Sequence, residues 1–361
     1  MHHRVPVLDL ERLDTDREAL VEEAGRAYRE YGFCGFRNHG IPEDVIAGAK
    51  RVFRDFFALP DAVKSRYRSG TGGQRGYTPF AVEQARDQAV PDLKEFWHVG
   101  REMGADNPWP GILQPNRWPS EVPGFRENAL ALYDRLDLLG GRILRIVARF
   151  LGLAPDWFEP QVRYGNSILR AIHYPPVTDR VPGAVRAAQH EDINLITLLL
   201  GSDEEGLEIL ARDGSWVPVT SIADTIVVNV GDMMQRLTNH ALPSTPHRVV
   251  NPPGSRSREP RYSIPFFLHP NPDFPIRTLP GCVSDENPDR YPQPITANEF
   301  LEQRLREIKL DAIKRSEAAE RAGSEEAEES TAEPAEEEAA AEEETEAEEA
   351  TVEPAEEETA A

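Results

Sequence analysis

The second half of the chain consists of short segments rich in β-branched and aromatic residues, and this pattern limits the fold more than any other feature. Turn-forming residues separate the segments, and Asp213-Gly214 between two of them is a strong signal for a β-hairpin. Many short strands at close spacing are typical of a β-sandwich or barrel. The segments begin at Ser167 and read SILRAIHYP, INLITLLLG, GLEIL, WVPV, TIVVNVG, HRVVN, RYSIPFFLH and PIRTLP.

The first half is expected to be mainly helical. Apolar residues recur at helical spacing from Thr15 to Tyr31, a short strand follows from Phe33 to Asn38, and Pro42 is placed to open a second helix. The stretch from Thr71 to Pro119 is rich in Gly, Pro and aromatic residues without a sustained period, which predicts a long loop region.

Two further amphipathic helices are expected. The first runs from Phe125 to Leu151, and Gly140-Gly141 marks a point at which it could bend or split. The second begins at Thr296 and should pack on the outside of the β region. The fold class is therefore mainly β with a helical cap.

The negative charge of the protein is concentrated at one end. Residues 324–361 hold 18 Glu and no Lys, Arg or Asp, so the rest of the chain carries only -5 of the formal -23. This acidic tail, in which TAEPAEEE recurs as TVEPAEEE, has nothing to bury and is expected to be disordered. A basic protein is its candidate partner. The mildly acidic remainder argues against nucleic-acid binding.

Cysteine usage and the start of the chain bear on the compartment. Cys34 and Cys282 lie far apart in sequence, and MHHRVPVLDL lacks a charged region followed by an apolar one. We therefore expect a reduced, cytoplasmic protein. No apolar run approaches the length of a membrane span, so no membrane partner is expected.

Three residues of the β-rich half form a candidate metal site. His190 and Asp192 lie two apart beside a strand-like segment, where a period of two would direct both side chains to one face. His247 lies 55 residues after Asp192, on another strand-like segment. Two imidazoles and one carboxylate from different strands suit iron(II) and leave coordination positions open. From these residues alone, polar strand ends without a metal remain an equal alternative.

A candidate carboxylate-binding pair lies further along the chain. Arg261 and Ser263 in RYSIPFF would share one face of a strand. The planar fork of an arginine and an adjacent hydroxyl can together bind a carboxylate. An exposed arginine in a salt bridge is the alternative interpretation.

Taken together, these motifs resemble the isopenicillin N synthase-like branch of the iron(II)/2-oxoglutarate-dependent oxygenases. The resemblance covers about Val5 to Lys309 and includes, in the family's order, AYREYGFCGFRNHGI, LRAIHYPP, HEDINLITLLL, VVNVGDMMQRLTNHALPSTPHRVVNP and RYSIPFF. It implies a double-stranded β-helix, or jelly roll, flanked by N-terminal and C-terminal helices. The expected division is a helical and loop region at 1–120, a supporting helix at 121–163, the catalytic jelly roll at 164–295, a C-terminal helix at 296–320 and the acidic tail.

The resemblance also implies roles for individual residues. His190, Asp192 and His247 would ligate iron, and Arg261 and Ser263 would hold the far carboxylate of 2-oxoglutarate. Tyr174 matches a family position that often contacts this co-substrate. The family's NYYPP run departs here at Ile172 and His173, which points to the bacterial side of the family. The stretch between His247 and Arg261 is longer than usual, as an extended hairpin loop would explain.

The expected activity is oxidation of a small organic substrate by hydroxylation, desaturation or cyclisation, with dioxygen consumed and succinate and CO2 released. One alternative keeps the iron but not 2-oxoglutarate, as in isopenicillin N synthase. A second is an ethylene-forming enzyme, and a third is a non-catalytic jelly-roll binding protein. The protein is expected to be a monomer.

Candidate substrate contacts lie in the aromatic loop stretch, which borders the substrate cleft in this family. For the two large apolar residues, simple packing of the cap onto the barrel is the alternative. His240 and His269 flank turns and are expected to face solvent. The candidates are Arg75, Tyr77, Phe96, Trp97 and His98.

Overall fold

The structure is a computed structural model, and it describes residues 4–68, 74–80, 82, 92–105, 107–176, 186–200, 206–219, 224–250 and 259–307. The chain divides into a unit at Met1–Asp311 and a second at Ala312–Ala361. The acidic tail and most of the expected hairpin loop before Arg261 lie outside the described residues. Among the described residues, no helix combines the length and the apolar character needed to cross a membrane.

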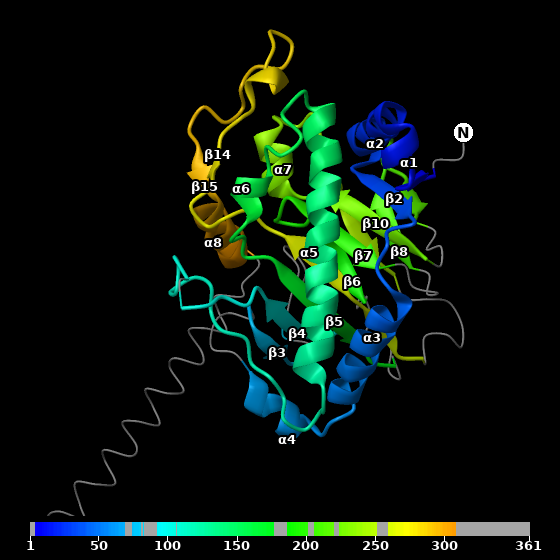
Figure 1. The fold of residues 1–361 in the computed structure, drawn as a ribbon, viewed down its shortest axis with the longest axis vertical. Helices are drawn as coiled ribbons and strands as arrows, with labels where there is room; N and C mark the ends of the chain where they lie inside the picture. Colours follow the sequence, from blue (N-terminus) through cyan, green and yellow to red (C-terminus); the bar gives the residue numbers. More distant parts are fainter. Residues whose placement is uncertain are drawn as a thin grey trace, which may run out of the picture. The chain divides into compact units, whose positions relative to one another are not determined.

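A nine-stranded sheet, here called the major sheet, is the largest element of the fold (Figure 1). Its strands follow the order β1-β2-β10-β7-β13-β5-β4-β3, and β12 also pairs with β5. Pairing is antiparallel except between β1 and β2. The strands are β1 (Val7–Asp9), β2 (Phe33–Arg37), β3 (Gly76–Thr78), β4 (Glu95–Gly100), β5 (Ile168–Tyr174), β7 (Ile196–Leu200), β10 (Thr225–Val230), β12 (Arg261–Ser263) and β13 (Pro265–Leu268).

A four-stranded minor sheet packs on the inner face of the major sheet. Its order is β6-β11-β8-β9, and Asp213-Gly214 does join β8 to β9, with Gly214 at a positive φ of 82°. Ile209 and Val217 of the minor sheet form a buried cluster with Phe33 and Val227 of the major sheet. The strands are β6 (Ala187–His190), β8 (Leu207–Leu210), β9 (Trp216–Pro218) and β11 (His247–Val249), and β14 (Pro275–Ile276) pairs separately with β15 (Ile295–Thr296).

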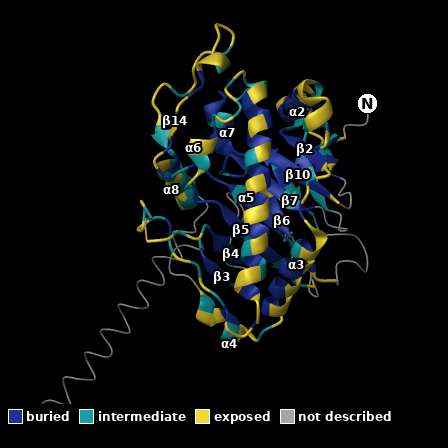
Figure 2. Ribbon diagram, in the orientation of Figure 1, coloured by how far each residue is buried: buried dark blue, intermediate teal, exposed yellow. Residues whose placement is uncertain are grey.

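Helices cover the outer face of the major sheet. The long helix α5 crosses this face, and its exposed and buried residues alternate along its length (Figure 2). It continues through Gly140-Gly141, where a Cβ on Gly140 would lie only 2.3 Å from Leu268 Cδ1. Gly140 therefore lets the helix lie close to the sheet. The helices are α1 (Arg12–Thr15), α2 (Arg17–Tyr31), α3 (Glu43–Phe57), α4 (Asp61–Lys64), α5 (Phe125–Phe150), α6 (Glu159–Val162), α7 (Asp232–Leu237) and α8 (Ala297–Glu307).

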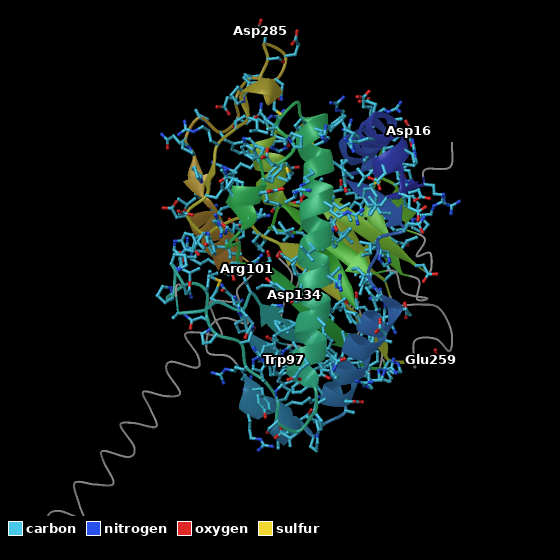
Figure 3. The ribbon with its side chains drawn as sticks, viewed as in Figure 1. Asp16, Trp97, Arg101, Asp134, Glu259 and Asp285 are labelled. Atoms are coloured by element: carbon cyan, nitrogen blue, oxygen red, sulfur yellow. The ribbon has the colours of Figure 1, made fainter. Side chains whose placement is uncertain are left out.

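The stretch from Thr71 to Pro119 is not only loop, because it contributes β3 and β4 to the major sheet. All six residues of β4 are buried, since helices cover one face and the barrel interior covers the other. Trp97, labelled in Figure 3, points outward, with its ring centroid 4.5 Å from Phe56 and 5.1 Å from Phe125. Phe96 points inward. A strand buried on both faces shows no polar alternation, which is why the sequence pattern missed it.

Candidate metal centre and substrate pocket

The three candidate ligands converge between the two sheets. His190 ends β6 and His247 begins β11, and the two residues are direct partners across the antiparallel pair, with ring centroids 4.4 Å apart. Asp192 lies two residues beyond the end of β6, so it is placed by a loop rather than by strand alternation. Its Oδ1 lies 3.9 Å from His190 Nε2 and 3.8 Å from His247 Nε2.

Backbone carbonyls fix the orientation of both imidazole rings. His190 Nδ1 hydrogen-bonds the carbonyl of Ala188 at 2.7 Å, and His247 Nδ1 hydrogen-bonds that of Thr245 at 3.1 Å. In each case the carbonyl belongs to the residue two positions earlier. Each bond places the ring proton on Nδ1 and directs the Nε2 lone pair toward Asp192. Burial and the neighbouring His247 lower the pKa of His190 to about 4, so its imidazole is neutral at pH 7.

The major sheet holds the carboxylate of Asp192. Its Oδ2 accepts hydrogen bonds from Thr197 Oγ1 at 2.6 Å and Asn229 Nδ2 at 2.8 Å. Burial raises the pKa of Asp192, but the two histidines and these hydrogen bonds outweigh burial and lower it. Oδ1 is therefore presented, as an ionised ligand atom, to the same point as the two Nε2 atoms. The three ligand atoms lie within 4.8 Å of one another, which fits a metal ion. This donor set suits iron(II).

A buried ion pair, absent from the sequence-based candidates, supports the strand that carries His190. Asp92 Oδ1 accepts a hydrogen bond from the backbone N–H of Ala188 at 3.1 Å. Its Oδ2 accepts one from Lys94 Nζ at 2.8 Å, and both side chains are buried. The carboxylate thus joins the start of β4 to β6. Sequence alone gave no signal for this role, because Asp92 and Ala188 are 96 residues apart.

The C-terminal helix is attached to the loop that carries Asp192. The carbonyl of Asp192 accepts a hydrogen bond from the N–H of Asp232 at 2.7 Å. Arg304 of α8 donates to Asp232 Oδ2 at 2.7 Å and lies 3.8 Å from Glu191. The position of α8 and that of the loop are therefore coupled through Arg304.

The candidate carboxylate-binding residues meet where β12 pairs with β5. Arg261 is the direct partner of Tyr174, and its Cζ lies 5.2 Å from the centroid of the tyrosine ring. Both side chains are buried. Ser263 is half-buried and lies opposite Ile172, on the same inner face as Arg261. The structure thus brings Arg261, Ser263 and Tyr174 together as expected from the sequence.

The candidate substrate residues on β4 divide between its two faces. Phe96 packs with Ile172 and Tyr174, and the ring of His98 lies 4.8 Å from that of Phe96. Both residues therefore line the interior between the sheets, where His98 Nε2 accepts a hydrogen bond from Arg170 Nε at 2.5 Å. Trp97 points to the helices instead.

The other two candidates, Tyr77 and Arg75, act in buried networks. Tyr77 donates a hydrogen bond to Glu95, which also binds Lys64 at 2.8 Å and His173 Nδ1 at 2.7 Å. The guanidinium of Arg75 donates to the side chain of Asn166 at 2.9 Å and to two backbone carbonyls. The structure does not bring either residue, or Trp97, together with the three candidate ligands.

One histidine was misjudged from the sequence. His269 is 7% exposed rather than solvent-facing. It follows β13 directly and lies two residues after Phe267. The two side chains therefore share one face of the strand, and that face points to the interior. Burial lowers its pKa to about 4. The turn residues around it hid this position, because a turn in the backbone says nothing about where the side chain points.

Comparison with known proteins gives consistent matches along the chain. Residues 5–121 match the family described as non-haem dioxygenase in morphine synthesis N-terminal, and residues 165–270 match the 2OG-Fe(II) oxygenase superfamily. A 2-oxoglutarate-Fe(II) type oxidoreductase of Emericella nidulans is 33% identical over 82% of this chain and 88% of its own length.

Two solved structures are also similar. A 2OG-Fe(II) oxygenase family protein from Caulobacter crescentus is 46% identical, with a TM-score of 0.80, and the match covers 86% of this chain and all of that one. A full-length Neurospora crassa protein, solved in complex with alpha-ketoglutarate and thymine, is 31% identical with a TM-score of 0.74, over 83% and 96% of the two chains.

Proposed function

The chain belongs to the 2OG-Fe(II) oxygenase superfamily, and from this membership we propose that His190, Asp192 and His247 hold the iron(II) with which it oxidises a small organic substrate. The protein is an iron(II)- and 2-oxoglutarate-dependent oxidoreductase with a jelly-roll core, so the expected fold class, family and cofactors are confirmed. The comparisons give no support to an oxidase that works without 2-oxoglutarate. The observation that carries the ligand assignment is the convergence of two oriented imidazoles on an ionised, hydrogen-bonded carboxylate.

In this proposal, other residues of the site bind the co-substrate 2-oxoglutarate. When bound, iron(II) and 2-oxoglutarate supply the activation of dioxygen that allows an unactivated C–H bond to be oxidised, with succinate and CO2 released. Arg261 holds the far carboxylate of 2-oxoglutarate with its planar fork, assisted by the hydroxyls of Ser263 and Tyr174. The burial of Arg261 and Tyr174 keeps water away from that carboxylate, which strengthens the attraction.

The substrate is proposed to lie over the inner face of β4 and β5. Phe96 and His98 line this surface, whereas Arg75, Tyr77 and Trp97 are left out because the structure engages them elsewhere. The similar Neurospora crassa protein was crystallised with thymine, a small planar ring, which supports a compact substrate of this kind.

The proposal also covers the division of the chain into segments, the oligomeric state and the compartment. The catalytic jelly roll is proposed at residues 164–295, with supporting segments at 1–120, 121–163 and 296–320, of which 308–320 lie outside the described residues. The protein acts as a monomer in the cytoplasm and does not bind nucleic acid. Its two cysteines, which are unpaired, support a reducing compartment. The acidic tail at 324–361 tethers a basic partner. The substitutions Ile172 and His173 in the NYYPP run and the similar Caulobacter protein support a bacterial branch.

The ligand assignment is tested by substitution. His190→Ala and Asp192→Ala should each abolish iron binding and succinate release from 2-oxoglutarate, because a site with two protein ligands no longer fixes the metal. His240→Ala serves as the control, since this histidine bonds Tyr291 away from the ligands and should leave both properties intact. Full succinate release by His190→Ala would refute the assignment. Succinate release by the unaltered protein separates it from oxidases that do not use 2-oxoglutarate.

A further inference from the structure

Two polar side chains meet on the inner face of the major sheet, just before the start of β5 and just after the end of β13. Phe267 is the direct partner of Ile168, and the same antiparallel register continued by two residues places His269 opposite Asn166. The N–H of His269 donates to Ser167 Oγ at 3.2 Å, so the two segments stay together beyond the paired strands. Directly opposite side chains on one face have Cβ atoms about 5 Å apart. Asn166 and His269 can therefore bind one small group together.

Asn166 carries a buried donor that lacks an acceptor. The residue is 3% exposed, and its Oδ1 accepts a hydrogen bond from the guanidinium of Arg75 at 2.9 Å. Because a guanidinium only donates, this bond fixes the amide oxygen toward Arg75 and the Nδ2 group away from it. Among the described residues, Nδ2 has no hydrogen-bond partner. Buried polar groups are normally paired, so this donor points to a ligand that supplies an acceptor.

His269 adds one donor and one acceptor beside that amide. Burial lowers its pKa to about 4, and the opposing charge of Asp192 does not outweigh burial, so the ring is neutral at pH 7. A neutral imidazole has one N–H and one bare nitrogen. Within the described part of the chain, the ring makes no hydrogen bond, since the bond to Ser167 comes from the backbone of His269. Both ring nitrogens are thus available to a ligand.

The pair lies beyond the candidate metal centre when viewed from the residues assigned to 2-oxoglutarate. Thr197, which holds Asp192, is the direct partner of Phe267. His269 lies two residues further along the chain, in the direction away from Arg261. Strand rise and strand spacing together put its Cα about 8 Å from that of Thr197. A small ring held by the pair would therefore lie beside the metal, on the side opposite to the far carboxylate of 2-oxoglutarate.

We propose that Asn166 and His269 bind the cis-amide edge of the primary substrate, which makes this chain an oxygenase of lactams and related cyclic amides. The proposal rests on the function proposed above. The Nδ2–H of Asn166 donates to the carbonyl oxygen of the substrate, and the amide N–H of the substrate donates to the bare ring nitrogen of His269. A carboxylate would be buried here against two neutral partners, which disfavours it. Arg75 is a positioning residue, because it orients Asn166 and does not touch the substrate.

The test measures the binding and the turnover of cyclic amides by the iron-loaded full-length protein. Under anaerobic conditions with 2-oxoglutarate, calorimetry gives Kd for 2-piperidone, hydantoin and uracil, for their fully N-methylated derivatives and for cyclopentanecarboxylate. We expect at least one cyclic amide to bind 10-fold or more tightly than its N-methylated derivative and than the acid, since loss of one hydrogen bond corresponds to about that factor. In air, the same amide should stimulate succinate release.

Two variants assign this preference to the pair. Asn166→Asp keeps an oxygen for Arg75 but replaces the Nδ2 donor, so Kd for the amide should rise roughly 10- to 100-fold, while KM for 2-oxoglutarate stays close to that of the wild type. His269→Phe keeps an aromatic ring without its nitrogens and should lose the preference for N–H over N–CH3. Asn298→Asp, on α8, is the matched control and should change neither property. If neither variant of the pair folds, the comparison with N-methylated derivatives in the wild type decides.

Several outcomes would overturn the proposal. These are equal binding of the N-methylated derivatives, tighter binding of the acid, no binding of any cyclic amide, or a preference for N–H that survives in both variants. Each differs from a failure of the proposed function, in which no succinate forms from 2-oxoglutarate under any condition, whether or not an amide binds.

Discussion

The two sheets contribute to the site in different ways. The minor sheet supplies both imidazoles, and each ring is oriented by a carbonyl only two residues earlier in the chain. The major sheet supplies Thr197 and Asn229, which hold Asp192, and the interior arginines Arg170 and Arg261. Apart from Thr197, these residues depend on contacts between segments far apart in sequence. The orientation of the two imidazole rings is thus a local property of two strand ends. The position of the Asp192 carboxylate and the binding of 2-oxoglutarate depend on the assembly of the larger sheet.

This difference predicts that damage to the two sheets has separable effects. A change in the minor sheet should remove the metal, and with it every later step. A change in the interior of the major sheet should weaken the binding of either iron, 2-oxoglutarate or substrate and leave the binding of the others nearly unchanged. The reason is that the contacts of this sheet are spread over several strands.

Arg261→Gln should produce the largest separable effect in the major sheet. The variant loses the charged fork opposite Tyr174, so KM for 2-oxoglutarate should rise roughly 100-fold. Iron affinity, measured by titration with iron(II) under anaerobic conditions, should change little, since Arg261 lies opposite Tyr174 on β12, whereas the imidazole ligands lie on the minor sheet. Arg145→Gln is the matched control for loss of an arginine. If iron affinity fell as far as it does in His190→Ala, the separation between the two sheets would not hold.

Asn229→Ala should have a smaller effect, and on iron instead. Among the described residues, removing the amide leaves Asp192 Oδ2 with the hydroxyl of Thr197 as its remaining side-chain donor. Loss of a hydrogen bond to a metal ligand typically weakens metal binding about 10- to 100-fold. Anaerobic iron titration measures this effect, and KM for 2-oxoglutarate at saturating iron should stay close to that of the wild type.

Thr197→Val tests the second donor to Asp192, because it removes the hydroxyl with little change in side-chain volume. It should weaken iron binding in the same direction, and the double variant more than either. A normal iron affinity in both single variants would mean that the minor sheet alone positions the metal.

The sequence was most informative where structure is local. The hairpin at Asp213-Gly214, the strand that contains Arg261 and Ser263, and α5 all follow from residues within one segment. Strand β4 was missed because it is buried on both faces and carries a buried charged residue, Glu95. Its partners Lys64, Tyr77 and His173 make that burial tolerable. No periodicity within residues 71–119 can reveal partners on α4 and β5.

The candidate site shows the same limit. His190 and Asp192 were paired through strand alternation, yet Asp192 lies beyond the strand and is placed by the N–H of Asp232 and by Asn229. Arg170 and Asp92 gave no signal, since their roles come from register between strands that are distant in sequence. His269 was assigned to solvent for the same reason.

The last predicted effect is on stability rather than on metal or co-substrate binding, and it concerns His269, a buried histidine on the major-sheet side. Its pKa is lowered from about 6.5 in the unfolded chain to about 4 in the fold, because burial disfavours the charged ring. Between these values the unfolded chain binds one more proton, so this group's contribution to the free energy of unfolding is present above pH 6.5 and is lost as the pH falls toward 4. In metal-free protein, the wild type should therefore lose on the order of 1 kcal/mol per pH unit relative to His269→Phe across this window. Urea unfolding at several pH values measures the difference, which should be constant above pH 7, where the ring is neutral in both states. Parallel curves from pH 4 to 6.5 would show that His269 is protonated as easily in the fold as outside it, and that the interior of the major sheet is wetter than its hydrogen-bonded contacts indicate.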